Sequence, residues 1–105
     1  MKFYLKNRNG RFDAMAEYDE ATHVFTVLKD SRVSDFVSDA DKFRGTKTIL
    51  KLREANVDRN GIVLNDVAFK SPSTAANFVT GTSTNGCKAW KDEYKRTFKE
   101  VVGSE

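Results

Sequence analysis

Apolar and polar residues alternate along much of the first third of the chain, which is the period of strands with one buried face. The alternation runs through 3–6 and again through 12–18, where Phe, Ala and Tyr side chains fall on one side. The stretch 23–29 is rich in Val, Phe and Thr, and apolar residues occupy both of its faces, which predicts a central strand. Turn sequences separate the three stretches. The pattern therefore predicts a three-stranded antiparallel meander.

A helical period replaces the alternation farther along the chain. The spacing of Ile49 and Arg53 places them on one face of a helix predicted at 46–56. The polar stretch 31–45 before it predicts a loop with local turns. After the helix and a further turn, alternation returns in a short strand predicted at 67–70.

A full set of start and stop signals marks the helix that follows. Ser71 is a preferred N-cap residue, because its hydroxyl can accept a backbone N–H left unpaired at a helix start. Pro72 suits the first helical position, and Gly81 supplies the left-handed residue that ends the helix. An Asn-Gly pair after the helix then predicts a turn into a short strand at 88–91.

These elements predict one α+β domain over residues 1–105, with an antiparallel sheet of five or six strands and two helices packed on it. Its core motif is 67–92. With 39% hydrophobic and 31% charged residues, the composition is that of an ordinary globular chain. A single cysteine allows no internal disulfide, and no apolar run is long enough to span a bilayer. We therefore expect a cytoplasmic protein without membrane contact.

The net charge of +3 is mild, but it is unevenly distributed. Acids outnumber bases in the segment 13–41, whereas bases outnumber acids in the segment 70–99. The bases of this second segment are Lys70, Lys88, Lys91, Lys95, Arg96 and Lys99. A polyanion would be attracted by the second segment and repelled by the first. The alternative interpretation is that these charges only solvate the surface.

The core motif also carries a recognisable pattern, which reads Phe-x-Ser-Pro-Ser-x-Ala-Ala, then Gly-x-Ser-x-Asn-Gly, then Trp-Lys. Its residues are Phe69, Ser71, Pro72, Ser73, Ala75, Ala76, Gly81, Ser83, Asn85, Gly86, Trp90 and Lys91. The pattern resembles a bacterial domain of unknown function that is usually found C-terminal to GIY-YIG nuclease domains or inside restriction-system proteins. It is also similar to the RAMA domain, a restriction-associated module proposed to read methylated adenine in DNA. Looser matches at 27–31 and 52–54 extend the resemblance, and Cys87 stands where the RAMA pattern prefers an aromatic residue.

The resemblance implies a DNA contact, and the capped helix offers one. Ser71, Ser73 and Thr74 have two interpretations: a helix cap alone, or hydroxyls that help the free N–H groups of the helix start to receive a backbone phosphate. The two roles are compatible, because a cap uses only one or two of the unpaired donors. Ser83 and Asn85 belong to a polar loop suited to base-edge contacts or to an ordinary solvated turn.

Trp90 also has two interpretations: a packing residue of the core, or a stacking surface for a base beside Lys88. Within the predicted strand, alternation puts Lys88 and Trp90 on one face. Lys95 and Lys99 would add phosphate contacts from the last segment of the chain. The complete candidate nucleic-acid site is Ser71, Ser73, Thr74, Ser83, Asn85, Lys88, Trp90, Lys95 and Lys99.

The sequence predicts no catalytic constellation. His23, the only histidine, lies among apolar residues of a predicted strand and is interpreted as structural or exposed. Cys87 has Lys88 beside it, but neither a histidine nor a second cysteine supports nucleophile chemistry. The aspartates lack the spacing of a cation-binding loop, and the glycines lack the lysine of a phosphate-binding loop. We therefore expect neither an enzyme nor a metal or other cofactor.

The sequence thus predicts a non-catalytic DNA-binding accessory module of a bacterial restriction or nuclease system. Its expected partner is duplex DNA, and its finer expected role is to sense a modified base such as methylated adenine. A nuclease subunit or domain is the second expected partner. The competing hypothesis is a protein-docking module with no nucleic-acid contact, which would use Phe36, Phe43 or Trp90 as its apolar contact.

Overall fold

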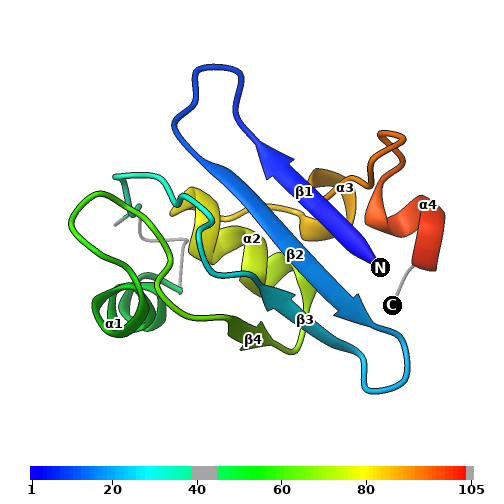
Figure 1. Cartoon of the computed structure of the whole chain (residues 1–105), viewed down its shortest axis with the longest axis horizontal. Coiled ribbons are helices and arrows are strands. Elements are labelled where there is room, and N and C mark those ends of the chain that lie inside the picture. Colours follow the sequence, from blue (N-terminus) through cyan, green and yellow to red (C-terminus); the bar gives the residue numbers. More distant parts are fainter. Residues whose placement is uncertain (39–44, 104–105) are drawn as a thin grey trace.

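The computed structural model describes residues 1–38 and 45–103, which form an antiparallel sheet with helices packed against one face (Figure 1). The strands are β1 (Lys2–Lys6), β2 (Asp13–Asp19), β3 (Val24–Val27) and β4 (Val67–Phe69), in the order β1-β2-β3-β4. The helices are α1 (Thr46–Asn56), α2 (Pro72–Thr80), α3 (Gly86–Ala89) and α4 (Phe98–Val102). Helix α2 lies against the sheet, α3 and α4 follow it on the β1 side, and α1 lies near β4 (Figure 1).

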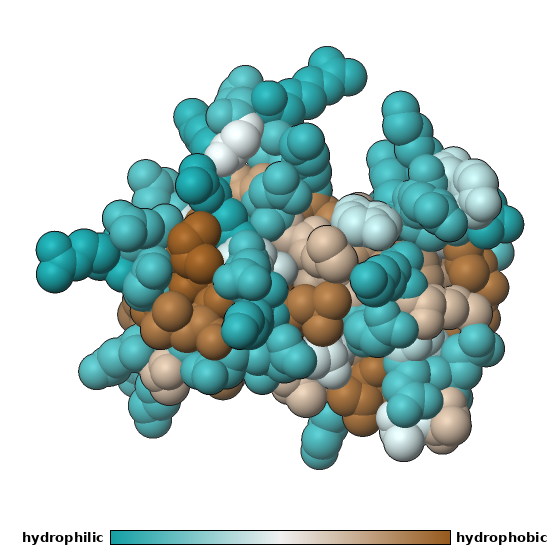
Figure 2. All heavy atoms as spheres, viewed as in Figure 1, coloured by the Kyte–Doolittle hydropathy of each residue, from teal (hydrophilic) through white to brown (hydrophobic). Residues whose placement is uncertain are grey.

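One face of the sheet is buried and the other is open. Buried side chains alternate with exposed ones along β1 and β2, as the sequence pattern predicts. The strand register puts the small side chain of Ala16 between Phe3 and Val27, so the centre of the buried face is shallow. The side of the molecule shown in Figure 2 is mainly hydrophilic, with scattered apolar side chains. The shallow inner face leaves room for a helix to approach the sheet closely.

Helix α2 occupies this space and has the caps that the sequence predicts. Its buried side chains are Pro72, Ala75, Ala76, Phe78 and Val79. The Ser71 hydroxyl accepts the N–H of Thr74 at 3.1 Å and so caps the helix start. Gly81 ends the helix with a φ of 80°, and a Cβ at this position would lie 1.7 Å from the carbonyl oxygen of Phe36. Only glycine satisfies both the conformation and this close approach.

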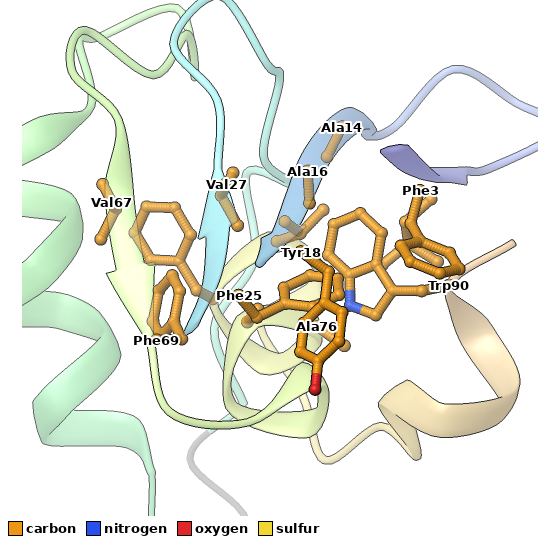
Figure 3. Close-up of a cluster of buried hydrophobic side chains, with 14 of the residues drawn as sticks. Phe3, Ala14, Ala16, Tyr18, Phe25, Val27, Val67, Phe69, Ala76 and Trp90 are labelled. Carbon is orange, nitrogen blue, oxygen red and sulfur yellow. The ribbon is translucent and has the colours of Figure 1, made fainter. Parts of the chain in front are cut away.

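An aromatic cluster fills the space between the sheet and the segment after α2 (Figure 3). Trp90 is fully buried, and its ring centroid lies 4.9 Å from that of Phe25. Phe98 of α4 packs edge-on against Tyr18 at 5.0 Å and lies 5.2 Å from Phe3. Aromatic pairs of this kind contribute about 0.5–1.5 kcal/mol each beyond the burial of their surface. The cluster therefore joins the C-terminal segment to the sheet through side chains.

Arg53 of α1 holds the last turn of α2. Its guanidinium donates to the carbonyl oxygens of Phe78 at 2.8 Å and Val79 at 3.2 Å. Carbonyl groups in the last turn of a helix have no backbone N–H donor within the helix. The same guanidinium donates to the carbonyl oxygens of Ser34 at 2.8 Å and Phe36 at 3.2 Å. Ser34 adds a direct link, because its own N–H donates to the Val79 carbonyl at 2.8 Å. One side chain thus connects α1, the segment 34–36 and the end of α2.

The α+β fold class, the meander and the two predicted helices are confirmed, although the sheet formed by the described residues has four strands where five or six are expected. The strand predicted at 88–91 is wrong, because the chain forms the short helix α3 there. The side chain of Asn85 accepts the N–H of Cys87 and caps a helical turn, where the Asn-Gly pair predicts a hairpin turn. Lys91 then forms an isolated antiparallel pair with Tyr4 at the β1 edge.

The predicted loop 31–45 is described at 31–38 and at Gly45, and the candidate docking residue Phe43 lies outside the described residues. The described part of the loop packs beside the end of α2, since the N–H of Ser38 donates to the carbonyl of Gly81 at 2.6 Å.

Replacement of Ser71 by Ala tests the cap of α2. We expect the free energy of unfolding to fall by about 1 kcal/mol, because an N–H of the first turn loses its acceptor. Chemical denaturation measures the change. Ser83→Ala is the matched control, because Ser83 is exposed, and its effect should stay below about 0.5 kcal/mol. Equal effects of the two substitutions would contradict the capping role.

Replacement of Arg53 by Lys tests the junction at the end of α2. Burial lowers the pKa of Arg53 to about 10, against the opposing effect of Asp35, so the side chain stays cationic at neutral pH. Lysine keeps the charge but cannot reach carbonyls on both sides, so we expect a loss of about 2–4 kcal/mol in the free energy of unfolding. The same substitution at the exposed Arg59 is the control and should be nearly neutral. A neutral Arg53→Lys would show that the junction does not stabilise the fold.

Candidate nucleic-acid interface

The first candidate residues lie at the start of α2. Besides accepting the N–H of Thr74, the Ser71 hydroxyl lies 2.8 Å from the Thr74 hydroxyl. Ser71 is half-buried, whereas Thr74 is exposed. The capping role of Ser71 is therefore confirmed, and the Thr74 side chain is accessible to a ligand.

The start of α3 packs directly onto the start of α2. The N–H of Gly86 donates to the Ser73 hydroxyl at 3.0 Å, and the indole N–H of Trp90 donates to the carbonyl of Pro72 at 3.0 Å. A side chain at Gly86 has no space, because a Cβ would lie 2.2 Å from the carbonyl carbon and oxygen of Pro72. We call this pair of packed helix starts, residues 71–74 and 85–88, the α2–α3 unit. Ser73 is part of its internal bonding.

The loop between the two helices is held by α2. The N–H of Thr84 donates to the side-chain oxygen of Asn77 at 2.8 Å, and the hydroxyls of Thr80 and Thr84 lie 2.8 Å apart. Ser83 and Asn85 are exposed at the surface of this loop. Both side chains are therefore accessible to a ligand on a loop that hydrogen bonds hold against α2. The side-chain oxygen of Asn85, however, already caps α3.

Trp90 is a packing residue, and the base-stacking interpretation needs correction. Its relative exposure is 0%, so no face of the ring is open to a base. The alternation that places Lys88 and Trp90 on one strand face does not apply, because Lys88 belongs to a helix and is exposed. The two side chains therefore do not form a joint binding surface.

The three candidate lysines are exposed but lie on different elements. Lys88 is on α3 and so belongs to the α2–α3 unit, whereas Lys95 lies in the turn before α4 and Lys99 lies on α4. The N–H of Phe98 donates to the carbonyl of Trp90 at 2.9 Å and ties this last segment to the end of α3. The structure thus joins Lys88 with the capping residues and places Lys95 and Lys99 on the adjoining segment.

Two acidic side chains of this segment are engaged within it. The Asp92 carboxylate lies 2.8 Å from the guanidinium of Arg96. Burial acts to raise the pKa of Asp92, but hydrogen bonds from Arg96 and Tyr94 outweigh this effect and hold that pKa below its usual value. Glu100 forms a capping box with Thr97 at the start of α4. The charge of Asp92 is therefore offset by Arg96, whereas Glu100 keeps its charge while it caps α4.

In the described part of the chain, neither His23 nor Cys87 belongs to a group of residues that resembles a catalytic or metal site. His23 occupies a turn with a φ of 60°, and its Nδ1 lies 3.0 Å from the Tyr18 hydroxyl. Cys87 is half-buried against the core. Among the described residues, no group of three or more His, Cys, Asp or Glu could hold a metal ion. In the same residues, no helix is long and apolar enough to cross a bilayer.

A large groove was missed by the sequence analysis. It has a volume of about 1080 Å³, and its described lining contains none of the candidate nucleic-acid-binding residues; we call it the arginine groove. The described arginines in its lining are Arg11, Arg32, Arg53 and Arg59. These residues are far apart in sequence, so no local motif marks them. Phe36, a candidate docking residue, also lines the groove.

Replacement of Gly86 by Ala tests the α2–α3 unit. The added Cβ would collide with backbone atoms of Pro72, so we expect the free energy of unfolding to fall by about 3 kcal/mol. Chemical denaturation gives the value. Gly10→Ala is the control, because its Cβ meets nothing within 4 Å and only the left-handed backbone costs about 1–2 kcal/mol. A smaller effect at Gly86 than at Gly10 would show that the helix starts are not in contact.

Comparison with known protein families gives a match over residues 3–102, which includes the described strands from Phe3 onward, the α2–α3 unit and the described lining of the arginine groove. No curated protein and no solved structure gives a significant match. The matched family is described as a domain of unknown function (DUF4357). Because the match covers nearly the whole chain, this protein belongs to the DUF4357 family.

Proposed function

We propose that this chain is a non-catalytic accessory module that binds duplex DNA through its C-terminal third, in a restriction or nuclease system. The resemblance of the core motif to domains of such systems supports the setting. The charges of the C-terminal third support the DNA contact. A nuclease domain or subunit is the second partner in this proposal.

One observation carries the DNA contact: the lysines of the C-terminal third are exposed, and they take part in no ion pair among the described residues. These residues are Lys70, Lys88, Lys91, Lys95 and Lys99. None of them forms an ion pair with another described residue, while Asp92 is bonded to Arg96 and Glu100 to Thr97. Exposed lysines favour association with a polyanion, because their binding to phosphates releases the counterions condensed on DNA.

The α2–α3 unit adds fixed polar groups to these lysines. The N-terminus of α2 carries the positive end of the helix dipole, with Lys70 just before it and Lys88 on the attached α3. Thr74 and Asn85 are exposed beside these charges. In this proposal Ser71 and Ser73 are positioning residues, because their hydroxyls already bind backbone N–H groups of the two helix starts.

Salt dependence and charge reversal test the contact. For wild type, we expect the logarithm of the association constant for duplex DNA to fall with the logarithm of salt concentration, with a slope of roughly −3, if three or four phosphates are neutralised. Replacing Lys88, Lys95 and Lys99 with Glu should abolish binding in a fluorescence anisotropy titration. The triple change Lys29→Glu, Lys47→Glu and Lys51→Glu removes the same charge elsewhere and should retain most of the binding. Equal losses in the two variants would show that net charge, and not this surface, drives binding.

The same titration with duplexes that contain methylated adenine tests the finer role. Phosphate contacts carry no information about the base, and the buried Trp90 offers no face for stacking. We therefore expect the lysine surface alone to bind methylated and unmethylated duplexes with equal affinity. A preference for methylated DNA that survives the change of Lys88, Lys95 and Lys99 would place base reading on another surface.

A further inference from the structure

Three segments that are distant in sequence meet along one wall of the arginine groove. Arg32 forms isolated antiparallel pairs with Asp13 on one side and with Ile62 on the other. The N–H of Arg32 donates to the carbonyl of Asp13 at 2.8 Å, and the N–H of Asp13 donates to the carbonyl of Arg32 at 2.9 Å. Arg11 and Arg59 precede Asp13 and Ile62 by a few positions and line the same groove. Backbone pairing thus places three arginines in the lining of one groove.

These three guanidinium groups are available to a ligand. Arg11, Arg32 and Arg59 are exposed, and none of them forms an ion pair with a described residue. Arginine binds phosphate through two parallel N–H groups and stays charged at any physiological pH. Arg53 behaves differently, because its donors are used by carbonyl groups of the fold. The described lining of the groove therefore combines one structural arginine with three that are outside any ion pair.

The acidic residues of the groove are Asp35, Glu54 and Asp58. The carboxylate of Asp58 accepts two backbone N–H groups of its own turn, at 2.8 and 3.0 Å. Asp35 acts on the guanidinium of Arg53, whose pKa it raises. Glu54 is exposed on α1. In the described part of the lining, four arginines outnumber these three acids, so the formal charge of the groove is positive.

An apolar surface lies beside the arginines. Phe36 is 56% exposed and Leu50 of α1 is 51% exposed, and both line the groove. The carbonyl oxygen of Phe36 accepts hydrogen bonds from the Ser34 hydroxyl at 2.9 Å and from Arg53 at 3.2 Å. The aromatic ring therefore projects into solvent from a backbone that is held in place.

We propose that the arginine groove binds single-stranded nucleic acid, with backbone phosphates on Arg11, Arg32 and Arg59 and an unpaired base against Phe36. A basic groove beside an exposed aromatic ring is the combination that single-strand binding uses, because every base has a face that can stack. Bases in a duplex are already stacked on their neighbours and cannot reach such a ring. The site is separate from the lysine surface proposed for duplex DNA and does not depend on it.

Fluorescence anisotropy with a labelled single-stranded oligothymidylate of about ten nucleotides, a length suited to one small domain, tests the proposal. Replacing Arg11, Arg32 and Arg59 with Gln should weaken binding at least about tenfold at low salt. Phe36→Ala should weaken it by about 5- to 100-fold, whereas Phe36→Tyr keeps a ring and should stay close to wild type. A thermal melt of each variant confirms that the fold is retained.

The matched control is the triple change Lys2→Gln, Lys6→Gln and Lys47→Gln, which removes the same charge from residues outside the groove lining and should bind like wild type. The proposal is overturned if wild type does not bind the oligonucleotide, if this control loses as much affinity as the arginine variant, or if Phe36→Ala has no effect. It is also overturned if a poly-glutamate peptide competes as well as the oligonucleotide, which would make the groove a docking site for an acidic protein. Absence of duplex binding with arginine-dependent single-strand binding would remove the proposed function and leave this inference standing.

Discussion

The contact between the Arg53 guanidinium and the end of α2 is the interaction on which the arrangement of the helices depends. A helix ends with carbonyl groups that its own backbone cannot satisfy and that carry the negative end of its dipole. A planar cation with several donors satisfies the carbonyls and opposes the dipole at once. Because Arg53 also binds the carbonyls of Ser34 and Phe36, the segment before α1 joins the same contact. The junction is polar throughout, which differs from the aromatic packing at the other end of α2.

The position of α2 determines where the rest of the C-terminal third lies. Ser73 in its first turn receives the N–H of Gly86, so the helix start determines where α3 lies. Trp90 then enters the core against Phe25 and brings the chain back to the sheet. The lysines that follow are thus carried by a hydrogen-bonded backbone, and their side chains are exposed to a polyanion. Rigid support with mobile charges suits backbone recognition better than base recognition.

The two basic surfaces differ in the chemistry that they offer. The lysine surface presents compact point charges, which attract phosphates with little demand on geometry. The arginine groove presents planar donors beside the ring of Phe36, which favours a ligand with a phosphate and an aromatic group close together. Both surfaces border α2, one near its start and the other near its end, because Arg53 belongs to the groove lining and also binds the last turn of the helix.

Local signals in the sequence determined the elements whose stability depends on neighbouring residues. The alternation along β1 and β2 and the cap at Ser71 act within one strand or one turn, so the sequence alone located them correctly. The Asn-Gly pair misled, since it suits both a hairpin turn and a helix cap, and the contact of Gly86 with Pro72 in the folded chain selected the helix. The burial of Trp90, the 25-residue link from Arg53 to Phe78 and the arginine groove were decided only by the tertiary structure. In each of these cases the partner groups lie far apart in the chain, and no local pattern encodes which of them will meet.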